Sequence, residues 1–461
     1  MKYSYYLIFT IIIGCNLSDS NKKIFIGGHI INPSSKYIAL FNGDKLIDSL
    51  DLDLDNKFIL KYDSLPPGIY KLEHPPQNQT LLIEPGDSIW VRVNTKDFDS
   101  SISYSGIGAA KNNFLIDTYL QLKNETSFLS SKYSFNSDDF SFIIDSLLFE
   151  KKKKWMSFDS INNLSPFAQK ITQSAYIYPY ANRRERYALI RGNNTLKKKD
   201  SINYFSFRKY LSLGEEDLSL FEPYIKYIMS YISNQSLDQD EYFSLTKDKT
   251  IFNIRRLKII DKQIPSSKLR STLFRSVAYH ELVNFKNHKF HQEFINFFNT
   301  LENGAKKHVD EIISLYKAIE LMQPGNTLPI IKLEDSSFVQ QNSSYIFNDK
   351  LTVIYFWSQT QINYFKNTYE LVLKYQKKFP NYRFVGICIQ PLNSLVLEFQ
   401  EELNISTNNQ YSMVDFEKGS KKWVLTVLNK GIIIDERGVI KEGFGVFTSK
   451  SFETDLLRNS N

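Results

Sequence analysis

Short apolar runs separated by turn residues dominate residues 24–107. Three of these runs, at 24–28, 37–41 and 57–62, are rich in Ile, Phe, Leu and Tyr, and Asn, Pro and Gly residues lie between them. Branched and aromatic residues favour strands, and Asn, Pro and Gly favour the turns between strands. Turn residues that recur at roughly regular intervals are typical of small sheets packed face to face. We therefore predict an N-terminal antiparallel β-sandwich over residues 24–107.

The spacing of apolar residues changes over residues 108–325. Apolar residues recur there at intervals of three and four, as in the series Phe140, Ile143, Ile144, Leu147 and Leu148. This spacing places side chains on one face of a helix. No repeat of fixed length is visible, which argues against a solenoid. The pattern predicts a central all-α domain of about six to eight helices over 108–325.

Two groups of polar residues in this central region are candidate sites. Lys151–Lys154 is a run of four lysines on a predicted helix, and such a run is more typical of a solvated helix face than of a phosphate or lipid-headgroup contact. His288 and His291 lie three residues apart, as two metal ligands on a helix would, but a metal site needs further ligands. We therefore expect no metal and no cofactor.

Strands and helices alternate over residues 326–461. The run at 351–357 is almost wholly apolar, which indicates a strand buried on both faces. The predicted elements after it are a helix at 362–378, a strand at 383–389, a helix at 392–402, strands at 431–435 and 439–444, and a helix at 449–457. A parallel strand pair with a crossover helix, closed by an antiparallel hairpin, predicts a C-terminal α/β domain. The whole chain is thus predicted to be multidomain α+β.

The motifs of this C-terminal domain resemble those of TlpA-like thiol-disulfide interchange proteins. The matching segments are Pro329, Tyr355–Trp357, Phe384–Ile387 and Ile432–Ile440. The resemblance implies a thioredoxin-like fold over 326–461. Many members of this family are envelope lipoproteins that carry a β domain and a helical insert before the thioredoxin unit. For the β-sandwich and the helical insert of this chain, the likeness is one of architecture only.

Two departures from the family pattern predict that this domain does no dithiol chemistry. In redox-active members two cysteines follow the strand-ending Trp by four and seven residues, and those positions are Gln361 and Tyr364 here. Neither side chain can form the thiolate that disulfide exchange requires. The family's cis-proline corresponds to Lys430, where we expect a trans peptide because a non-proline cis bond costs about 2.5–4 kcal/mol. We expect no catalytic residue.

We predict that the groove beside the former redox position binds a protein or peptide. The candidate residues of this groove are Trp357, Ser358, Gln359, Thr360, Gln361 and Lys430. The alternative is a thiol-disulfide oxidoreductase, or a redox protein that uses Cys388 as a single reactive thiol. Cys388 lies in an apolar strand, which favours a buried structural thiol. Sugar or lipid binding by the β-sandwich is a third class, with fold analogy as its only support.

The first residues of the chain read as an export signal. Residues 1–14 combine Lys2 with an apolar run that is shorter than the ~20 residues a membrane span needs. Gly14 followed by Cys15 resembles the bacterial lipobox, which implies cleavage before Cys15 and lipid attachment to its sulfur. An ordinary signal peptide with a chance cysteine is the alternative. We predict a signal peptide at 1–14, a lipidated tether at 15–23 and a location at the cell envelope, on the periplasmic face or the outer membrane.

Composition narrows the choice of partners. The net charge of +7 is spread along 461 residues, and no compact basic stripe alternates with aromatic residues, so we expect no nucleic-acid partner. The sequence has two cysteines, Cys15 and Cys388, which excludes a disulfide framework. The expected partners are therefore a membrane, through the lipid at Cys15, and a polypeptide.

Overall fold

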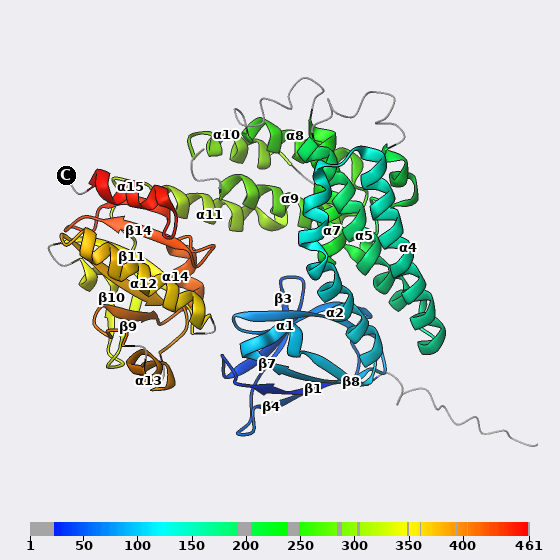
Figure 1. Cartoon of the computed structure of the whole chain (residues 1–461), viewed down its shortest axis with the longest axis horizontal. Coiled ribbons are helices and arrows are strands. Elements are labelled where there is room, and N and C mark those ends of the chain that lie inside the picture. The colour runs from blue at the N-terminus through cyan, green and yellow to red at the C-terminus, as the bar shows by residue number, and fades with distance from the viewer. Residues whose placement is uncertain are drawn as a thin grey trace, which may run out of the picture. The chain divides into compact units, whose positions relative to one another are not determined.

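The computed structural model describes residues 23–191, 204–237, 249–283, 288–301, 305–347, 350–359, 361–392, 394–402 and 404–459. The chain divides into two compact units, and Figure 1 labels their elements. The first comprises residues 1–130 and 147–177, and the second comprises residues 131–146 and 178–461. Among the described helices, none is both long and apolar enough to cross a membrane.

Eight strands form two four-stranded sheets in the first unit. One sheet has the order β4-β1-β7-β8 and is built from Ile24–Ile31 (β1), Lys57–Tyr62 (β4), Ser88–Asn94 (β7) and Ser103–Ile107 (β8). The other has the order β3-β2-β5-β6 and is built from Tyr37–Asn42 (β2), Lys45–Asp51 (β3), Gly68–His74 (β5) and Gln77–Ile83 (β6). Alternate side chains of both sheets meet in one hydrophobic core, which explains the alternating burial of the predicted strands.

The pairing of β1 with β7 departs from the antiparallel arrangement that the sequence predicts. These two strands run parallel, with Ile26 opposite Ile89 and Gly28 opposite Val91. All other strand pairs of the two sheets are antiparallel. Parallel neighbours need a long connection rather than a hairpin, and here five other strands separate β1 from β7 along the chain.

Over residues 95–321 the described elements are helices, apart from β8. Their bounds are Thr95–Asp97 (η2), Phe98–Ser101 (α1), Ala109–Asn124 (α2), Thr126–Ser131 (α3), Lys132–Ser134 (η3), Ser137–Asn162 (α4), Pro166–Arg191 (α5), Phe205–Tyr210 (η4), Glu216–Leu218 (η5), Glu222–Ser236 (α7), Lys249–Gln263 (α8), Ser267–Leu282 (α9), His288–Phe298 (α10), Lys306–His308 (η7) and Val309–Leu321 (α11). Over 108–325 the described residues hold nine α-helices, against the six to eight predicted. The short α3, of six residues, has too few apolar positions to show a helical period.

The two polar groups weighed in the helical region have different surroundings. Lys152, Lys153 and Lys154 are exposed on α4, as predicted for a solvated face. Lys151 is buried instead, and its Nζ lies 2.8 Å from Glu125 Oε1, because the helix turns this residue away from its neighbours in the run. His291 is buried, and the side chain of His288 lies outside the described residues.

Seven strands form one mixed sheet at the C-terminal end of the chain. Its order is β10-β9-β13-β12-β11-β14-β15. The elements are Lys332–Asp335 (β9), Gln340–Asn342 (β10), Ser343–Ile346 (η8), Leu351–Trp357 (β11), Ile362–Lys378 (α12), Tyr382–Cys388 (β12), Ser394–Glu402 (α13), Gln410–Met413 (β13), Phe416–Lys422 (α14), Lys430–Ile434 (β14), Ile440–Val446 (β15) and Lys450–Asn459 (α15). β11, β12 and β13 run parallel, and β14 and β15 pair antiparallel beside β11. The order of β12, β11, β14 and β15 is the thioredoxin-like order that the sequence predicts, whereas β9, β10 and β13 were not predicted.

Helices α12 and α15 cover one face of this sheet. Phe365 and Val372 of α12 and Phe452 and Leu456 of α15 share a core with β11 and β12. On the opposite face Phe356 of β11 meets Trp423, with ring centroids 6.2 Å apart. The central strand β11 is therefore buried on both faces, which accounts for its almost unbroken apolar sequence.

Candidate binding edge of the C-terminal sheet

Three strand ends meet at one edge of the C-terminal sheet. β11 and β12 run parallel and end together, with Trp357 opposite Cys388. β14 runs antiparallel to β11 and begins there, with Gly431 opposite Tyr355. In open α/β sheets ligands bind outside the carboxyl ends of the parallel strands. The topology thus brings the predicted groove residues to one edge, although it does not expose all of them.

Trp357 supports this edge from inside the domain. Its side chain is fully buried and stacks on Phe365 of α12, with ring centroids 3.9 Å apart. Its Nε1 donates to Gln410 Oε1 at 3.0 Å, and Gln410 Nε2 donates to the Tyr355 hydroxyl at 2.7 Å. Gly386 leaves the space for this pair, because a Cβ there would lie 2.2 Å from Gln410 Oε1. Trp357 is therefore not a contact residue.

The amide of Gln390 holds the loop that follows β11. Gln390 Nε2 donates to Ser358 Oγ at 2.9 Å, and Gln390 Oε1 accepts from the main-chain N–H of Gln359 at 3.2 Å. Gln359 Nε2 donates in turn to the Pro391 carbonyl at 2.6 Å. Ser358 is fully buried, whereas Gln359 is half-buried. The loop is thus fixed by the hydrogen bonds of two neutral amide side chains, those of Gln359 and Gln390.

The start of α12 carries neither sulfur nor charge. Gln361 is exposed at the helix N-cap, and its main-chain N–H donates to the Ser358 carbonyl at 3.1 Å. Tyr364 is half-buried one turn later, and burial raises the pKa of its hydroxyl. Thr360 lies outside the described residues. Among the predicted groove residues that the structure describes, Gln361 is therefore the most open to a partner.

Lys430 does not reach the surface, contrary to its predicted role as a contact residue. Its side chain is only 4% exposed, and Nζ donates to the main-chain carbonyls of Trp423 at 2.6 Å and Val424 at 3.1 Å. Nζ also lies 4.4 Å from the centroid of the Phe444 ring. Burial lowers the pKa of Lys430 to about 7, against a smaller raising effect of Glu442.

The main chain around Lys430 agrees with the sequence. The one cis peptide bond among the described residues joins Pro75 to Pro76, so the bond before Lys430 is trans as predicted. The loop that precedes β14 exposes Val427 instead, at 58%. Sequence analysis missed Val427 because an apolar side chain in a loop gives no pattern of its own.

Cys388 is a buried structural thiol, as predicted. It is fully inaccessible, and its Sγ donates to Gln390 Oε1 at 3.5 Å. Burial raises its pKa to about 12. Gln390 was missed by the sequence analysis, although a polar residue directly after the apolar strand and before Pro391 is a usable signal for a strand-end contact.

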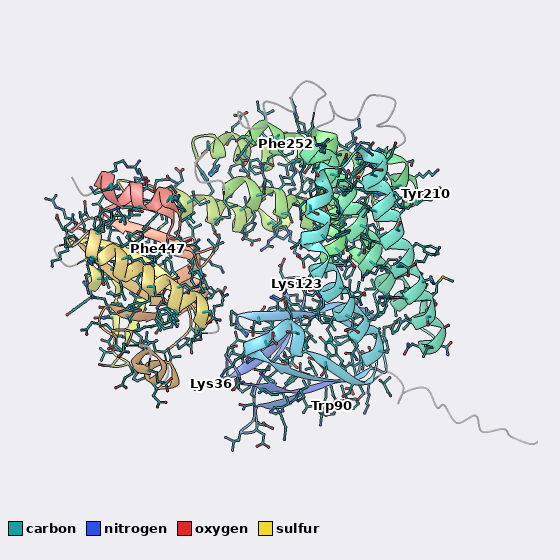
Figure 2. The ribbon with its side chains drawn as sticks, in the orientation of Figure 1. Lys36, Trp90, Lys123, Tyr210, Phe252 and Phe447 are labelled. Atoms are coloured by element: carbon teal, nitrogen blue, oxygen red, sulfur yellow. The ribbon has the colours of Figure 1, made fainter. Side chains whose placement is uncertain are left out.

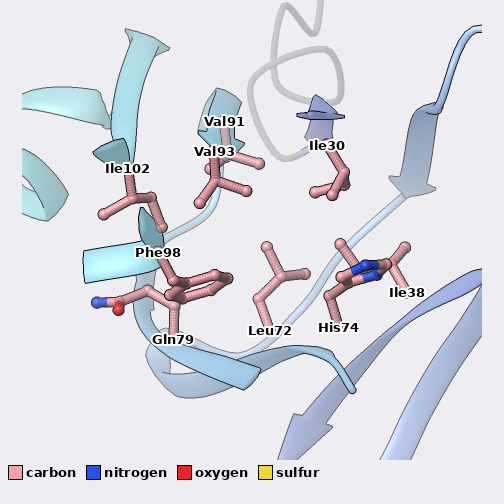
Figure 3. Close-up of a pocket in the computed structure, with 9 residues that line it drawn as sticks. All are labelled: Ile30, Ile38, Leu72, His74, Gln79, Val91, Val93, Phe98 and Ile102. Carbon is pink, nitrogen blue, oxygen red and sulfur yellow. The ribbon is translucent and has the colours of Figure 1, made fainter. Parts of the chain in front are cut away.

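A small apolar cavity lies in the core of the first unit. Figure 3 shows the nine residues that line it, of which His74 and Gln79 are polar. His74 Nε2 accepts from the main-chain N–H of Ser34 at 3.0 Å, and Nδ1 lies 3.0 Å from the Tyr37 carbonyl. Both ring nitrogens are thus engaged, and burial lowers the pKa of His74. His74 therefore has no free ring nitrogen with which to bind a ligand in this cavity.

Comparison with known proteins finds structural neighbours alone. No family model matches the chain, and no curated protein matches it. Similar solved structures include the thioredoxin domain of a thiol-disulfide oxidoreductase from Bacteroides vulgatus, at 18% identity and TM-score 0.25 over 29% of this chain and 98% of that one. A thiol:disulfide interchange protein from a Bacteroides species aligns at 16% identity and TM-score 0.23 over 26% and 78%. A thioredoxin-like protein from Bacteroides caccae aligns at 12% identity and TM-score 0.30 over 60% and 92%. The C-terminal fold is assigned from its strand order and not from these alignments.

Proposed function

We propose that this chain is a lipid-anchored protein of the bacterial cell envelope whose thioredoxin-like domain binds a polypeptide and does not exchange disulfides. The observation that carries the proposal is the chemistry of the sheet edge. Gln361 and Tyr364 stand at the two sulfur positions of the fold, and the remaining thiol, Cys388, is fully buried. Without an accessible thiolate the edge has no nucleophile for disulfide exchange.

The accessible part of the edge suits a polypeptide. Gln359 and Gln361 offer amide donors and acceptors, and Val427 adds an exposed apolar side chain. Val427 lies in the loop before β14, whose first residues pair with β11 at this edge. A surface of neutral hydrogen-bonding groups around an apolar contact matches the mixed polar and apolar character of an extended peptide.

Insulin reduction discriminates this proposal from the oxidoreductase alternative. We expect the purified chain to give no turnover above the uncatalysed rate with dithiothreitol as reductant. The Cys388→Ser variant should behave identically. Turnover that Cys388→Ser abolishes would overturn the non-redox proposal and favour a single-cysteine enzyme.

Site-specific photo-crosslinking in intact cells tests the binding edge. A photoreactive residue at Gln361 should give discrete crosslinked species, and a second at Val427 should give the same species. The control position is Leu373, which is 50% exposed on α12 and lies three turns from the edge along that helix. The groove proposal fails if Gln361 and Val427 give no product beyond that of Leu373.

A further inference from the structure

One tryptophan of the first unit lies on an open sheet face. Trp90 of β7 is 45% exposed, whereas the other three tryptophans of the sequence, Trp155, Trp357 and Trp423, are at most 9% exposed. β7 lies inside the sheet β4-β1-β7-β8, so both of its edges are already paired. Figure 2 labels Trp90 on this sheet. A single exposed aromatic side chain is common on protein surfaces, but the surroundings of Trp90 distinguish it from such a residue.

Glycines on both neighbouring strands let the indole lie against the sheet. Gly27 of β1 pairs with Trp90, and a Cβ at Gly27 would lie 2.6 Å from Cζ3 of the indole. On the other side a Cβ at Gly106 of β8 would lie 3.3 Å from Cδ1. The six-membered ring therefore rests over β1 and the five-membered ring faces β8. An indole held in this way presents a flat surface at little cost in side-chain entropy.

The outward positions around Trp90 carry basic side chains, the exposed Ile59 and Ile107, and no carboxylate. Arg92 follows two residues later on β7 and pairs with His29 of β1, which pairs in turn with Lys57 of β4. Lys61 lies on the same face of β4, opposite Phe25. Lys57 has Asp55 at 3.3 Å, but among the described residues Arg92 and Lys61 have no ion pair. An unpaired guanidinium beside an aromatic platform is complementary to an anionic group on a ring-shaped ligand.

We propose that this face binds an acidic saccharide, with one sugar ring stacked on Trp90 and its carboxylate or sulfate held by Arg92. The C–H face of a pyranose is apolar and flat enough to stack on an indole, while its anionic substituent lies at the ring edge. This proposal is independent of the proposed function of the C-terminal edge.

Two other occupants fit the geometry less well. A peptide strand cannot extend the sheet beside Trp90, because β1 and β8 already pair with β7 on both sides. A bilayer contact uses aromatic side chains that project into the interface, and the contacts with Gly27 and Gly106 hold this indole against the sheet.

Tryptophan fluorescence of the whole chain gives a direct test. Because Trp90 is the one substantially exposed tryptophan, acrylamide should quench part of the emission of the free protein. Polygalacturonate or heparin should protect that part from quenching, and neutral dextran should not. The two acidic polymers distinguish a carboxylate from a sulfate as the recognised group.

Two variants distinguish the contribution of the Trp90 ring to binding from that of the Arg92 charge. Trp90→Ala should weaken binding of the preferred acidic polymer at least about tenfold, as expected for the loss of one ring-stacking contact. Arg92→Gln, which leaves the platform intact, should weaken binding and reduce its salt dependence. The control Tyr210→Ala removes an aromatic ring that is 78% exposed in the second unit and should leave binding unchanged.

Four results would overturn the proposal. The first is tryptophan fluorescence that acrylamide does not quench in the free chain. The second is that the chain binds neither acidic polymer, and the third is that it binds dextran equally well. The fourth is an unchanged affinity for the acidic polymer in both Trp90→Ala and Arg92→Gln. Trp90-dependent binding to anionic phospholipid vesicles in place of the polymers would also overturn it and would assign the face to a membrane.

Discussion

Cys388 and Lys430 are buried ionisable side chains near the same edge, and burial favours the neutral form of each. Desolvation raises the pKa of the thiol to about 12 and lowers the pKa of the amine to about 7. The two shifts have opposite signs because the thiol is charged when it loses its proton and the amine is charged when it holds one. Each shift leads to its own prediction.

Cys388 should resist thiol reagents while the chain is folded. At pH 8 a pKa of about 12 leaves roughly one thiol in 10⁴ ionised, and the sulfur is inaccessible as well. In the Cys15→Ala variant, Ellman's reagent should therefore label no thiol in the native protein and one thiol per chain in guanidinium chloride. Rapid labelling of the native chain would contradict the buried, inert role.

Lys430 should make the stability of the chain rise between pH 7 and pH 10. The unfolded chain holds the Lys430 proton up to its ordinary pKa of 10.5, whereas the folded chain loses it near 7. Stability rises with pH wherever the unfolded state binds more protons. The free energy of unfolding of the native sequence, minus that of Lys430→Met, should therefore increase over this range in urea titrations.

Lys374→Met is the matched control for this pH dependence. Lys374 is exposed on α12, so its removal should shift the free energy of unfolding by less than about 0.5 kcal/mol at each pH. A flat difference for Lys430→Met as well would show that Lys430 stays protonated in the folded chain.

Of these two residues, the sequence predicted the burial of Cys388 correctly and that of Lys430 wrongly. The burial of Cys388 followed from its apolar strand, whose neighbours all favour the interior. The burial of Lys430 did not, because lysine is rarely fully buried and its acceptors are the main-chain carbonyls of Trp423 and Val424, seven and six residues earlier in the chain. Every residue has a main-chain carbonyl, so the residue pattern does not indicate which of them accept a hydrogen bond.

At the scale of elements, α2 is fixed to the first unit by a buried ion cluster. Lys111 Nζ lies 2.7 Å from Glu84 Oε2 and 2.8 Å from Asp87 Oδ2, at the turn between β6 and β7. The next residue, Asn112, donates to the Leu82 carbonyl and accepts from the Leu82 N–H. Burial raises the pKa of Asp87, and Lys111 opposes that shift.

Removing the cation should be strongly destabilising. Lys111→Met leaves two carboxylates without their buried partner, and loss of one member of a buried pair costs about 3–5 kcal/mol. Chemical denaturation of the first unit should show a loss of this size at pH 7. Adding Glu84→Gln and Asp87→Asn to Lys111→Met should recover part of it, since the uncompensated charges are then gone.

Lys57→Met tests the same substitution at an exposed pair. Lys57 and Asp55 are 55% and 74% exposed, so the expected loss is under about 1 kcal/mol. Similar losses for Lys57→Met and Lys111→Met would show that the cluster beneath α2 carries no special share of the stability.

In the C-terminal sheet, strand predictions succeeded where the apolar run was long and failed where the strand was short. β11 and β12 were predicted from seven-residue apolar runs, whereas the four-residue β13 and β9 were missed. Both strands lie between two others in the sheet, and β13 pairs with strands far along the chain, β9 on one side and β12 on the other. Short strands owe their conformation to those partners, and a local window of sequence does not contain them.

At the scale of the whole molecule, the proposal that Cys15 carries a lipid leads to a prediction about the location of the protein. Cys15→Ala should move the protein from the membrane fraction to the soluble fraction and abolish its labelling by radioactive palmitate. Two or three acyl chains bind a bilayer stably, and Cys15→Ala removes the proposed site of their attachment. Asn16→Ala is the control and should stay with the membrane. Membrane retention of Cys15→Ala would contradict lipidation at this residue.

The sequence by itself determined that two residues at the start of α12 cannot form a thiolate. A residue type either can or cannot form a thiolate, and Gln361 and Tyr364 cannot, whatever surrounds them. The sequence also determined the long strands and helices, because their periodic patterns are local. The tertiary structure alone decided which side chains reach solvent. In the folded chain Ser358 and Lys430 are buried, Gln361 and Val427 are exposed, and the indole of Trp90 lies between two glycines. The reason is physical: exposure depends on partners that distant segments supply, and only folding brings those segments together.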